Sequence, residues 1–185
     1  MILMKPRTPR EDYGIVLDFL SHGHAGSYDR LAVAQVLGEQ HLVILEVVPR
    51  KGISLQPGEK VYIGPDKREK VHHVAGRIPY EQLSQTAKGE LDRLVEKIVT
   101  EREPDFVKFY NTCGPISTRL HTLEVLPGIG KKHMWDILNA RKEKPFETFA
   151  DIKNRVKLIP DPKQSIINRI MDEIMQTDKY RLFVG

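Results

Sequence analysis

The sequence predicts an α+β protein of more than one domain, in which a small five-stranded β-barrel precedes an all-helical region. Short runs rich in Val, Ile, Leu and Tyr, separated by turn residues, fill residues 13–78. Apolar residues at helical spacing dominate from residue 83 onward. The chain has 185 residues, 40% hydrophobic and 29% charged, which is enough for one large or two small packed domains.

The first domain is predicted at residues 1–80, with residues 1–12 as a loose, polar, Pro-containing arm. Five short strands are expected after the arm, at Tyr13–Leu20, Leu31–Leu37, Leu42–Val48, Lys60–Ile63 and Val71–Ile78. Five strands in so short a stretch favour a small closed barrel. An OB-like barrel is the first choice and an SH3-like barrel the second. Both commonly bind nucleic acid, although a fold alone does not give a function.

Aromatic and basic residues of the barrel are candidate contacts with nucleic acid, because aromatic rings can stack on unpaired bases. They are Tyr28, Arg30, Tyr62, Lys67, Arg68, Lys70, His72 and His73. The structural alternative, favoured for each residue taken singly, is that Tyr62 packs in the core and the lysines cover a hairpin tip. His22 and His24 could form a ligand pair, but no third ligand is marked by spacing, so no metal site is predicted.

Residues 81–116 are predicted to be linking helices. Apolar residues between 83 and 98 follow helical spacing, and Gly89 is a point where this helix could bend or break. Pro104 suits the first position of a second, shorter helix, which Gly114-Pro115 would end. Nothing in this stretch marks chemistry, so these helices are interpreted as packing struts.

The stretch from Leu123 to Ala140 organises the remainder of the chain. Apolar stripes flank Pro127-Gly128-Ile129-Gly130, which predicts a helix, a tight turn and a second helix. The two glycines allow positive φ and leave the backbone bare, and Ile129 is expected to fill the gap between the helices. Unpaired N–H groups and the positive end of the second helix suit a phosphate, and Lys131 and Lys132 add charge there.

The run from Leu126 to Gly130 resembles, position by position, the hydrophobic-Pro-Gly-hydrophobic-Gly core of helix-hairpin-helix motifs. Met134 departs from that family, which usually has a small residue there. The resemblance implies that backbone N–H groups grip a nucleic-acid phosphate without reading sequence, and that the turn could hold a monovalent cation. The alternative is an ordinary αα-hairpin. The predicted nucleic-acid-binding residues are Gly128, Ile129, Gly130, Lys131, Lys132, Arg119, Arg141 and Lys142.

A second, degenerate hairpin is predicted at residues 146–177. Thr148 and Asp151 have the form of a capping box, and Asp161 with Pro162 would start the next helix. Because Ile-Pro-Asp-Pro replaces the glycine-rich turn, this hairpin is expected to be structural. The two hairpins together make the predicted tandem domain of residues 117–185, of which 178–185 are a short tail.

The net charge of +4 is only mildly basic, but basic residues gather around the first hairpin, as a phosphate-binding surface would need. Residues 127–157 contain Lys131, Lys132, Arg141, Lys142, Lys144, Lys153, Arg155 and Lys157 against Asp136, Glu143, Glu147 and Asp151. No apolar run predicts a membrane span, and the N-terminus lacks the apolar core of a secretory signal. Cys113 is the one cysteine, which fits a cytoplasmic protein.

An enzyme is the less favoured interpretation. Similar hairpins occur in base-excision glycosylases, in which a catalytic Asp follows the motif, and Asp151 lies near that position. Its capping role already explains Asp151, and no Lys or Thr-His pair matches the glycosylase signature. There is no P-loop, no Gly-x-Ser-x-Gly and no recognisable pair of metal-binding carboxylates. A non-enzymatic protein without a cofactor is therefore predicted. A glycosylase or a nuclease is the less favoured alternative.

The order of parts, ending in Ser-Thr-Arg-Leu-His-Thr-Leu-Glu-Val-Leu-Pro-Gly-Ile-Gly-Lys-Lys at 117–132, resembles the archaeal family of unknown function numbered 655. RNA or nucleic-acid binding is ascribed to that family, whose genes tend to lie near ribosomal and rRNA-modifying functions. The resemblance implies a nucleic-acid partner, with RNA favoured over DNA. It also implies ribosomal or RNA-processing components as further partners. The alternative is a protein–protein adaptor that uses an exposed apolar patch around Trp135.

Overall fold

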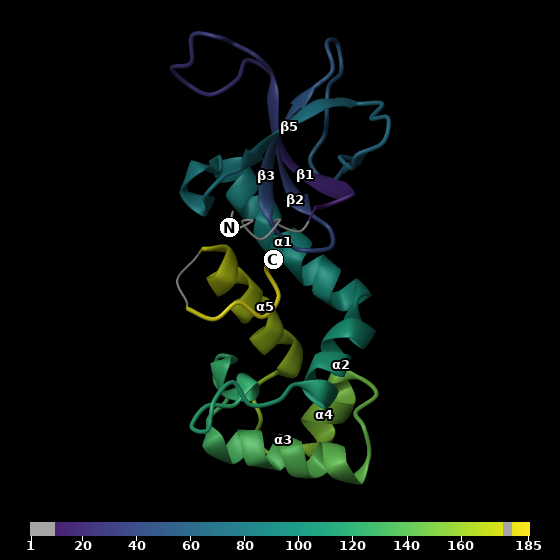
Figure 1. Ribbon diagram of the computed structural model, residues 1–185, viewed down its shortest axis with the longest axis vertical. Helices are drawn as coiled ribbons and strands as arrows, with labels where there is room; N and C mark the ends of the chain where they lie inside the picture. Colours follow the sequence, from purple (N-terminus) through teal and green to yellow (C-terminus); the bar gives the residue numbers. More distant parts are fainter. Residues whose placement is uncertain (1–9, 176–178) are drawn as a thin grey trace, which may run out of the picture. The chain divides into compact units, whose positions relative to one another are not determined.

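The computed structural model describes residues 10–175 and 179–185 (Figure 1). The chain divides into two compact units. Of the described residues, the sheet unit comprises 10–94, 173–175 and 179–185, and the helical unit comprises 95–172. The chain passes between them inside two helices, α1 (Gln85–Glu101) and α5 (Pro162–Ile174). This division follows spatial contacts, whereas the sequence divided the chain at residues 80 and 116.

A curled five-stranded antiparallel sheet forms the first unit, at the places that the alternation of apolar runs and turns predicted. Its strands are β1 (Tyr13–Leu20), β2 (Val33–Gly38), β3 (Ile44–Pro49), β4 (Lys60–Tyr62) and β5 (Val71–Arg77). Their order in the sheet is β4-β1-β2-β3-β5, and every neighbouring pair is antiparallel.

β-Bulges help to curl this sheet. The register shifts between Val16 and Asp18 of β1, and twice more along the β3–β5 pair. An extra residue in one strand bends it and strengthens the local twist. The sheet nevertheless stays open, because β4 and β5 are its two edges in the part of the chain that the structure describes. The closed barrel expected from the sequence is therefore not formed.

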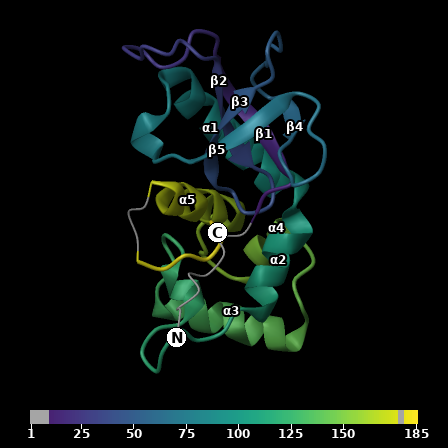
Figure 2. The same cartoon turned by 45° about the horizontal axis from the view of Figure 1, so that its top comes forward.

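Strand β2 is buried along its whole length and fixes the start of α1. The Gln35 side chain donates to the carbonyl of Gln82, in the 3₁₀-helix η1 (Tyr80–Gln82), at 3.0 Å and accepts the Ser84 N–H at 2.9 Å. The Ser84 hydroxyl donates to Asp18 of β1 at 2.5 Å. Helix α1 begins beside the sheet (Figures 1 and 2) and runs unbroken through Gly89.

Two terminal segments belong to the sheet unit. Glu11 is only 5% exposed, and its carboxylate accepts the N–H groups of Gln40 and His41 at 2.8 and 2.5 Å. Of the predicted loose arm, residues 1–9 lie outside the described residues, and Glu11 is held in the fold. Near the C-terminus, the Glu173 carboxylate accepts the N–H groups of residues 182–184. The predicted tail of residues 178–185, described from 179 onward, is thus fixed to this unit.

The helical unit consists of short helices. They are the last part of α1, α2 (Glu103–Thr112), the 3₁₀-helix η2 (Thr122–Val125), α3 (Lys131–Glu143), α4 (Phe149–Arg155) and the first part of α5. Tyr110 of α2 is fully buried in the core, where its hydroxyl donates to the Pro162 carbonyl at 2.9 Å. Burial raises the pKa of this phenol. The apolar stripes of α3, α4 and α5 supply the rest of the core through Ile137, Ile152 and Ile166.

The helix starts predicted after the first hairpin are present. Thr148 accepts the Asp151 N–H at 3.0 Å, and Asp161 accepts two N–H groups at the start of α5, whose first residue is Pro162. Residues 176–177 of the predicted second hairpin lie outside the described residues. The first hairpin differs from its prediction, because its leading arm is one 3₁₀ turn, η2, where a helix was expected from the Leu stripe.

Candidate nucleic-acid-binding site

The turn between η2 and α3 adopts the predicted backbone conformation at one of its two glycines. Gly128 has φ +81°, a left-handed conformation that favours glycine. Gly130 is extended, with φ −96° and ψ −174°, so positive φ does not explain its place. Ile129 is 5% exposed and fills the space under the turn, and its N–H is bonded to the Leu126 carbonyl at 3.1 Å. It is therefore a plug and offers no N–H to a ligand.

Helix α3 begins without a cap at this turn. The first amide bonded in the α3 ladder is that of Met134, which donates to the Gly130 carbonyl at 2.9 Å. Among the described residues, the amides of Lys131, Lys132 and His133 have no hydrogen-bond partner, and no side chain caps the helix. A Cβ built on Gly130 would meet nothing within 4 Å, so its backbone faces open space. Unpaired N–H groups at a positive helix end are suited to an anion.

Residues between Pro160 and Arg169 contact the first hairpin and hold its turn in place. A Cβ built on Gly128 would lie 2.9 Å from Cγ of Pro160, so the two turns are in direct contact. Ser165 donates from its hydroxyl to the Pro127 carbonyl at 3.2 Å, and Arg169 donates to the Val125 carbonyl at 3.4 Å. The turn is thereby fixed in place by α5 and the residues before it.

The two lysines at the start of α3 have different surroundings. The Lys131 ammonium donates to the Glu124 carboxylate at 3.1 Å and to the Arg119 carbonyl at 3.3 Å. The hydrogen bond from the His121 backbone and the Lys131 ammonium together hold the pKa of Glu124 below its usual range. Lys131 is thus partly neutralised. Lys132 is exposed and has no ion-pair partner among the residues that the structure describes.

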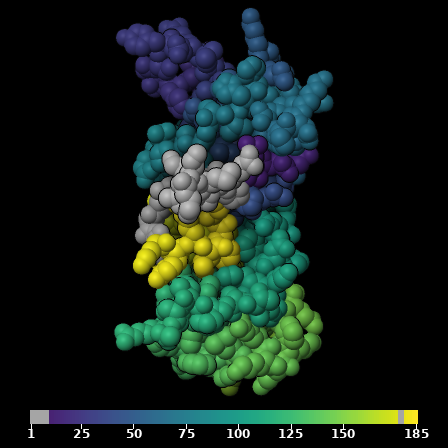
Figure 3. Space-filling view, in the orientation of Figure 1, coloured from purple at the N-terminus to yellow at the C-terminus, as the bar shows by residue number. Residues whose placement is uncertain are grey.

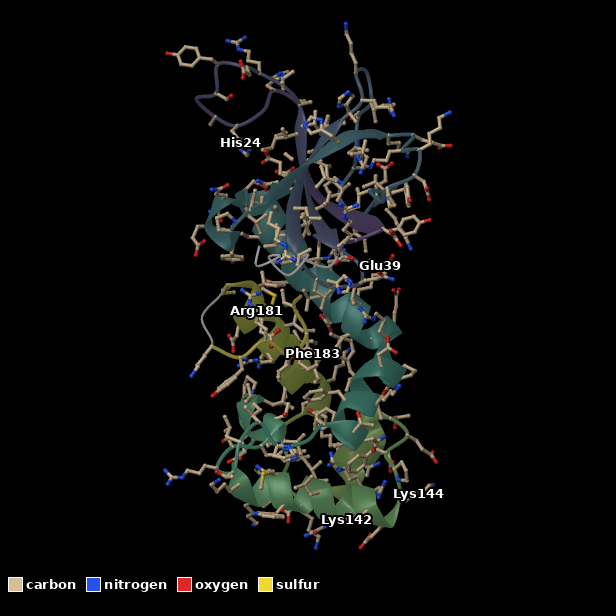
Figure 4. All side chains as sticks on the ribbon, in the orientation of Figure 1. His24, Glu39, Lys142, Lys144, Arg181 and Phe183 are labelled. Carbon is tan, nitrogen blue, oxygen red and sulfur yellow. The ribbon has the colours of Figure 1, made fainter. Side chains whose placement is uncertain are left out.

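The other predicted contacts separate into structural and accessible ones. Arg141 donates to the carbonyls of Tyr110 and Cys113 at 3.1 and 2.9 Å, so it ties α3 to α2 and does not extend a phosphate track. Lys142, at the C-terminal end of α3, is exposed (Figure 4). Arg119 is exposed on the loop before η2. The accessible basic side chains near α3 are therefore Arg119, Lys132 and Lys142, with Lys131 shared.

Sequence reasoning missed the capping box that shapes η2. The His121 Nδ1 accepts the Leu123 N–H at 3.1 Å, and the Glu124 carboxylate accepts the His121 N–H at 2.8 Å. His121 is 9% exposed, and burial lowers its pKa, with the Arg141 charge lowering it further. The signal for this cap was present in the sequence, because Glu124 stands three residues after His121.

We expect the helical unit to lose stability as the pH falls below about 6.5, the ordinary pKa of His121. The pKa is lowered in the folded state, so the unfolded chain takes up the proton first and the stabilisation, full above that pH, is lost in acid. Urea unfolding followed by fluorescence of Trp135, the chain's one tryptophan, measures this unit. His121→Asn keeps a capping acceptor without the titration, and an unchanged pH profile in that variant would contradict the assignment.

The predicted contacts of the sheet unit lie on its loops. Tyr28 is 102% exposed on the β1–β2 loop, which projects from the sheet in Figure 3, and Arg30 follows it with φ 35°. Lys67 is exposed on the β4–β5 loop. Other candidates have partners within the sheet unit. The Tyr62 hydroxyl donates a hydrogen bond to the Asp66 carboxylate and accepts one from the Asp66 N–H. Arg68 donates to the Gly64 carbonyl, and Lys70 forms an ion pair with Glu59.

Three histidines of the sheet unit contact neighbouring side chains. His24 lies 2.6 Å from the Glu46 carboxylate, and Nδ1 of His72 lies 2.8 Å from Nδ1 of His73. Among the described residues, no three His, Cys, Asp or Glu side chains gather closely enough to hold a metal ion. Within the same residues, no helix combines the length and the apolar character that crossing a membrane would require.

Asp151, the one carboxylate considered for catalysis, is held by its neighbours. It accepts the Glu147 N–H at 3.0 Å and pairs with Arg155 at 3.2 Å. The Glu147 hydrogen bond and the Arg155 charge lower its pKa. Arg155 also donates to the carbonyls of Ala140 and Lys144 at 2.6 and 2.7 Å, closing the end of α3. These contacts give Asp151 a structural role in the link from α3 to α4.

Sequence reasoning also missed a cavity of about 370 Å³ in the sheet unit. Arg10 and Arg77 line it together with Arg68, beside apolar residues of β3 and β5. Arg77 is exposed at the end of edge strand β5, in which Val71 is the one buried residue, so the strand shows no alternation that would mark a cavity in the sequence.

The chain is similar to two archaeal proteins and to one family model. A family model described as "Protein of unknown function (DUF655)" matches residues 10–185. The uncharacterized protein MJ0038 of Methanocaldococcus jannaschii is 44% identical over 176 residues, which cover 94% of this chain and 80% of that protein. The crystal structure of Af1531 from Archaeoglobus fulgidus has a TM-score of 0.84 and 43% identity, over 95% of this chain and 100% of that chain.

Proposed function

The chain belongs to the DUF655 family of proteins of unknown function, as its sequence predicted. On that premise we propose that it is a non-enzymatic nucleic-acid-binding protein that favours RNA over DNA. The helical unit would hold a backbone phosphate as a helix-hairpin-helix motif does. The sheet unit would act as an OB-like platform for a further segment of the same strand. Ribosomal or RNA-processing components are the partners that the family resemblance suggests.

One observation carries the proposal. The amides of Lys131, Lys132 and His133 point out of the helix end unpaired, and Gly130 leaves the backbone beside them uncovered. Helix stability alone gives no reason for this arrangement, since a Ser, Thr, Asp or Asn at Gly130 would cap the helix and stabilise it. An uncapped N-terminus with a bare backbone leaves room for phosphate oxygens to take the place of the cap.

The surrounding charge supports the same ligand. Lys132 and Lys142 are exposed without ion-pair partners among the described residues, and Arg119 stands on the neighbouring loop. The loops of the sheet unit that carry Tyr28 and Lys67 are the β1–β2 and β4–β5 loops, which bind oligonucleotides in OB-folds. Contacts of this kind position the protein on a phosphate backbone and do not read sequence.

Replacing Gly130 with alanine should weaken binding while leaving the fold intact. The position is extended and a Cβ meets no atom within 4 Å, so the free energy of unfolding should change by less than about 0.5 kcal/mol. The added methyl group occupies the path of the phosphate to the amides. Losing charge-assisted hydrogen bonds should lower affinity by about 10- to 100-fold. Titrations with single-stranded RNA, structured RNA and duplex DNA at several salt concentrations measure this and rank the three ligands.

Two glycine substitutions serve as controls. Gly114→Ala adds the same methyl group in open space of the same unit, at a residue outside the turn, and should bind like the wild type. Gly128→Ala should destabilise the protein by about 2–4 kcal/mol, because alanine disfavours φ +81° and its Cβ would press on Pro160. If Gly130→Ala binds as tightly as Gly114→Ala, or if the wild type binds none of the three ligands at low salt, the proposal is wrong.

A protein–protein adaptor is the second candidate, and exposed apolar side chains favour it. In the helical unit Trp135 is 55% exposed and Leu158, with φ 59°, is 88% exposed. An adaptor would keep its binding when Lys132 is changed and would lose it when these apolar residues are changed. The salt dependence separates the two functions, because a few phosphate contacts lower log affinity by about 0.7–0.9 per contact for each unit of log salt.

A further inference from the structure

The outer face of α3 carries a single aromatic ring among basic side chains. Trp135 is 55% exposed, and the exposed residues on its face are Lys131, Lys132, Asn139 and Lys142. The opposite face of the helix is the one that packs, since Met134 and Ile137 are 5% and 0% exposed. Lys142, which shares the outer face, projects away from the rest of the helical unit in Figure 4.

Helical geometry places these side chains together. At 3.6 residues per turn, Lys131, Lys142, Trp135 and Asn139 fall within an arc of about 80°. Trp135 lies one turn, about 6 Å along the axis, after Lys131. Cα–Cβ bonds in a helix tilt toward its N-terminus, so the indole leans toward the turn that carries the unpaired amides. The acidic residues of α3, Asp136 and Glu143, lie outside this arc.

Contacts within the protein do not explain why an indole stands at position 135. Among the described residues, the Trp135 indole has no stacked ring, no cation over its face and no hydrogen-bond partner. An exposed indole contributes little to stability where it lies, and large aromatic surfaces in contact with water commonly mark binding sites.

We propose that Trp135 stacks on an unpaired nucleobase of the strand whose phosphate is held at the start of α3. The inference rests on the proposed function and narrows its substrate class to single-stranded nucleic acid, or to a base that is bulged or splayed from a structured RNA. A paired and stacked base in a duplex cannot offer its face to the indole. Base–aromatic stacking is tolerant of sequence, because every base has a π-face.

The charges around the ring favour nucleic acid over a protein as the occupant. Lysine is depleted at protein–protein interfaces, whereas tracks of basic residues interleaved with aromatic rings are typical of single-strand binding grooves. Lys131 and Lys142 stand on either side of Trp135 along the helix, where the phosphates before and after a stacked base would pass.

The chain's one tryptophan makes the test direct, because Trp135 alone provides the indole emission. We would titrate the full chain with a mixed-sequence single-stranded RNA oligomer, and with an oligomer of the same length in which abasic sites replace the bases. Stacking should quench the emission with the base-containing oligomer and leave it nearly unchanged with the abasic one. The abasic oligomer should bind roughly 5- to 150-fold more weakly while keeping the salt dependence.

Variants at the same position complete the test. Trp135→Phe keeps a ring and should retain most of the affinity, whereas Trp135→Leu should lose about as much affinity for the base-containing oligomer as removing the bases does. Equal binding of both oligomers without quenching would overturn the stacking role and leave the phosphate grip supported by its salt dependence. If neither oligomer binds at low salt, the proposed function fails and the stacking role fails with it. The wild-type comparison of the two oligomers decides the matter even if Trp135→Leu folds poorly.

Discussion

Reversing two charges on α3, with Lys132→Glu and Lys142→Glu together, should lower the affinity for single-stranded RNA by on the order of a hundredfold at low salt. Both side chains are exposed and have no ion-pair partner among the described residues, so both are available to phosphates. Each phosphate contact that is lost should also reduce the slope of log affinity against log salt by about 0.7–0.9. Fluorescence anisotropy of a labelled RNA over a salt series measures both quantities.

The two substitutions have opposite effects on the helix, which separates binding from folding. A glutamate at Lys132 lies in the first turn of α3, where a negative charge complements the helix dipole, and one at Lys142 lies in the last turn, where it opposes it. Each effect is about 0.3–1 kcal/mol, so the double variant should fold like the wild type. Arg141, although basic and adjacent, is unsuitable for this test because it holds α3 to α2. An unchanged salt slope in the double variant would contradict a phosphate track along α3.

Replacing Arg169 with alanine should destabilise the helical unit by about 3–5 kcal/mol. Arg169 is 1% exposed and is among the largest fully buried side chains. One of its contacts is a hydrogen bond from Nη1 to the carbonyl of Val125, the last residue of η2. Truncation leaves a cavity and removes the donor from a partly buried carbonyl. Urea unfolding monitored by the emission of Trp135 reports on this unit.

Arg169→Met is the matched variant, because it keeps much of the volume and removes the charge with its donors. Filling a buried ionic site with a well-packed apolar chain often costs far less than truncating it, so this variant should be the more stable of the two. Lys153→Ala, on the exposed side of α4, should stay within about 0.5 kcal/mol of the wild type. A loss below about 1 kcal/mol for Arg169→Ala would show that the arginine does not hold the hairpin in place.

Patterns confined to a short stretch of chain were readable from the sequence. The strand β1 has the predicted bounds, because its apolar residues and the flanking turn residues act locally. The caps at Thr148 and Asp161 and the proline that starts α5 follow from side chains that bond their own backbone a few residues away. The family was also readable, since it depends on the motif at residues 117–132 and the order of parts.

Patterns that depend on distant partners were not readable. The closed barrel was wrong because closure requires β4 and β5 to pair, and neither strand carries in its own sequence the register of the other. The leading arm of the first hairpin is a 3₁₀ turn, although its leucines are spaced as in an α-helix. Leu123 and Leu126 are buried there by contacts within the helical unit, and burial alone produces the same apolar spacing.

The candidate site shows the same division residue by residue. The sequence alone was enough to predict a phosphate-binding turn, because the Pro-Gly-Ile-Gly run and the lysines after it are contiguous. Only the tertiary structure decided which basic side chains are accessible: Lys131 is paired with Glu124, Arg141 is fixed to α2, and Lys132 and Lys142 remain exposed. The physical reason is that a charge is neutralised by neighbours in space, and a linear sequence specifies these neighbours only through the fold.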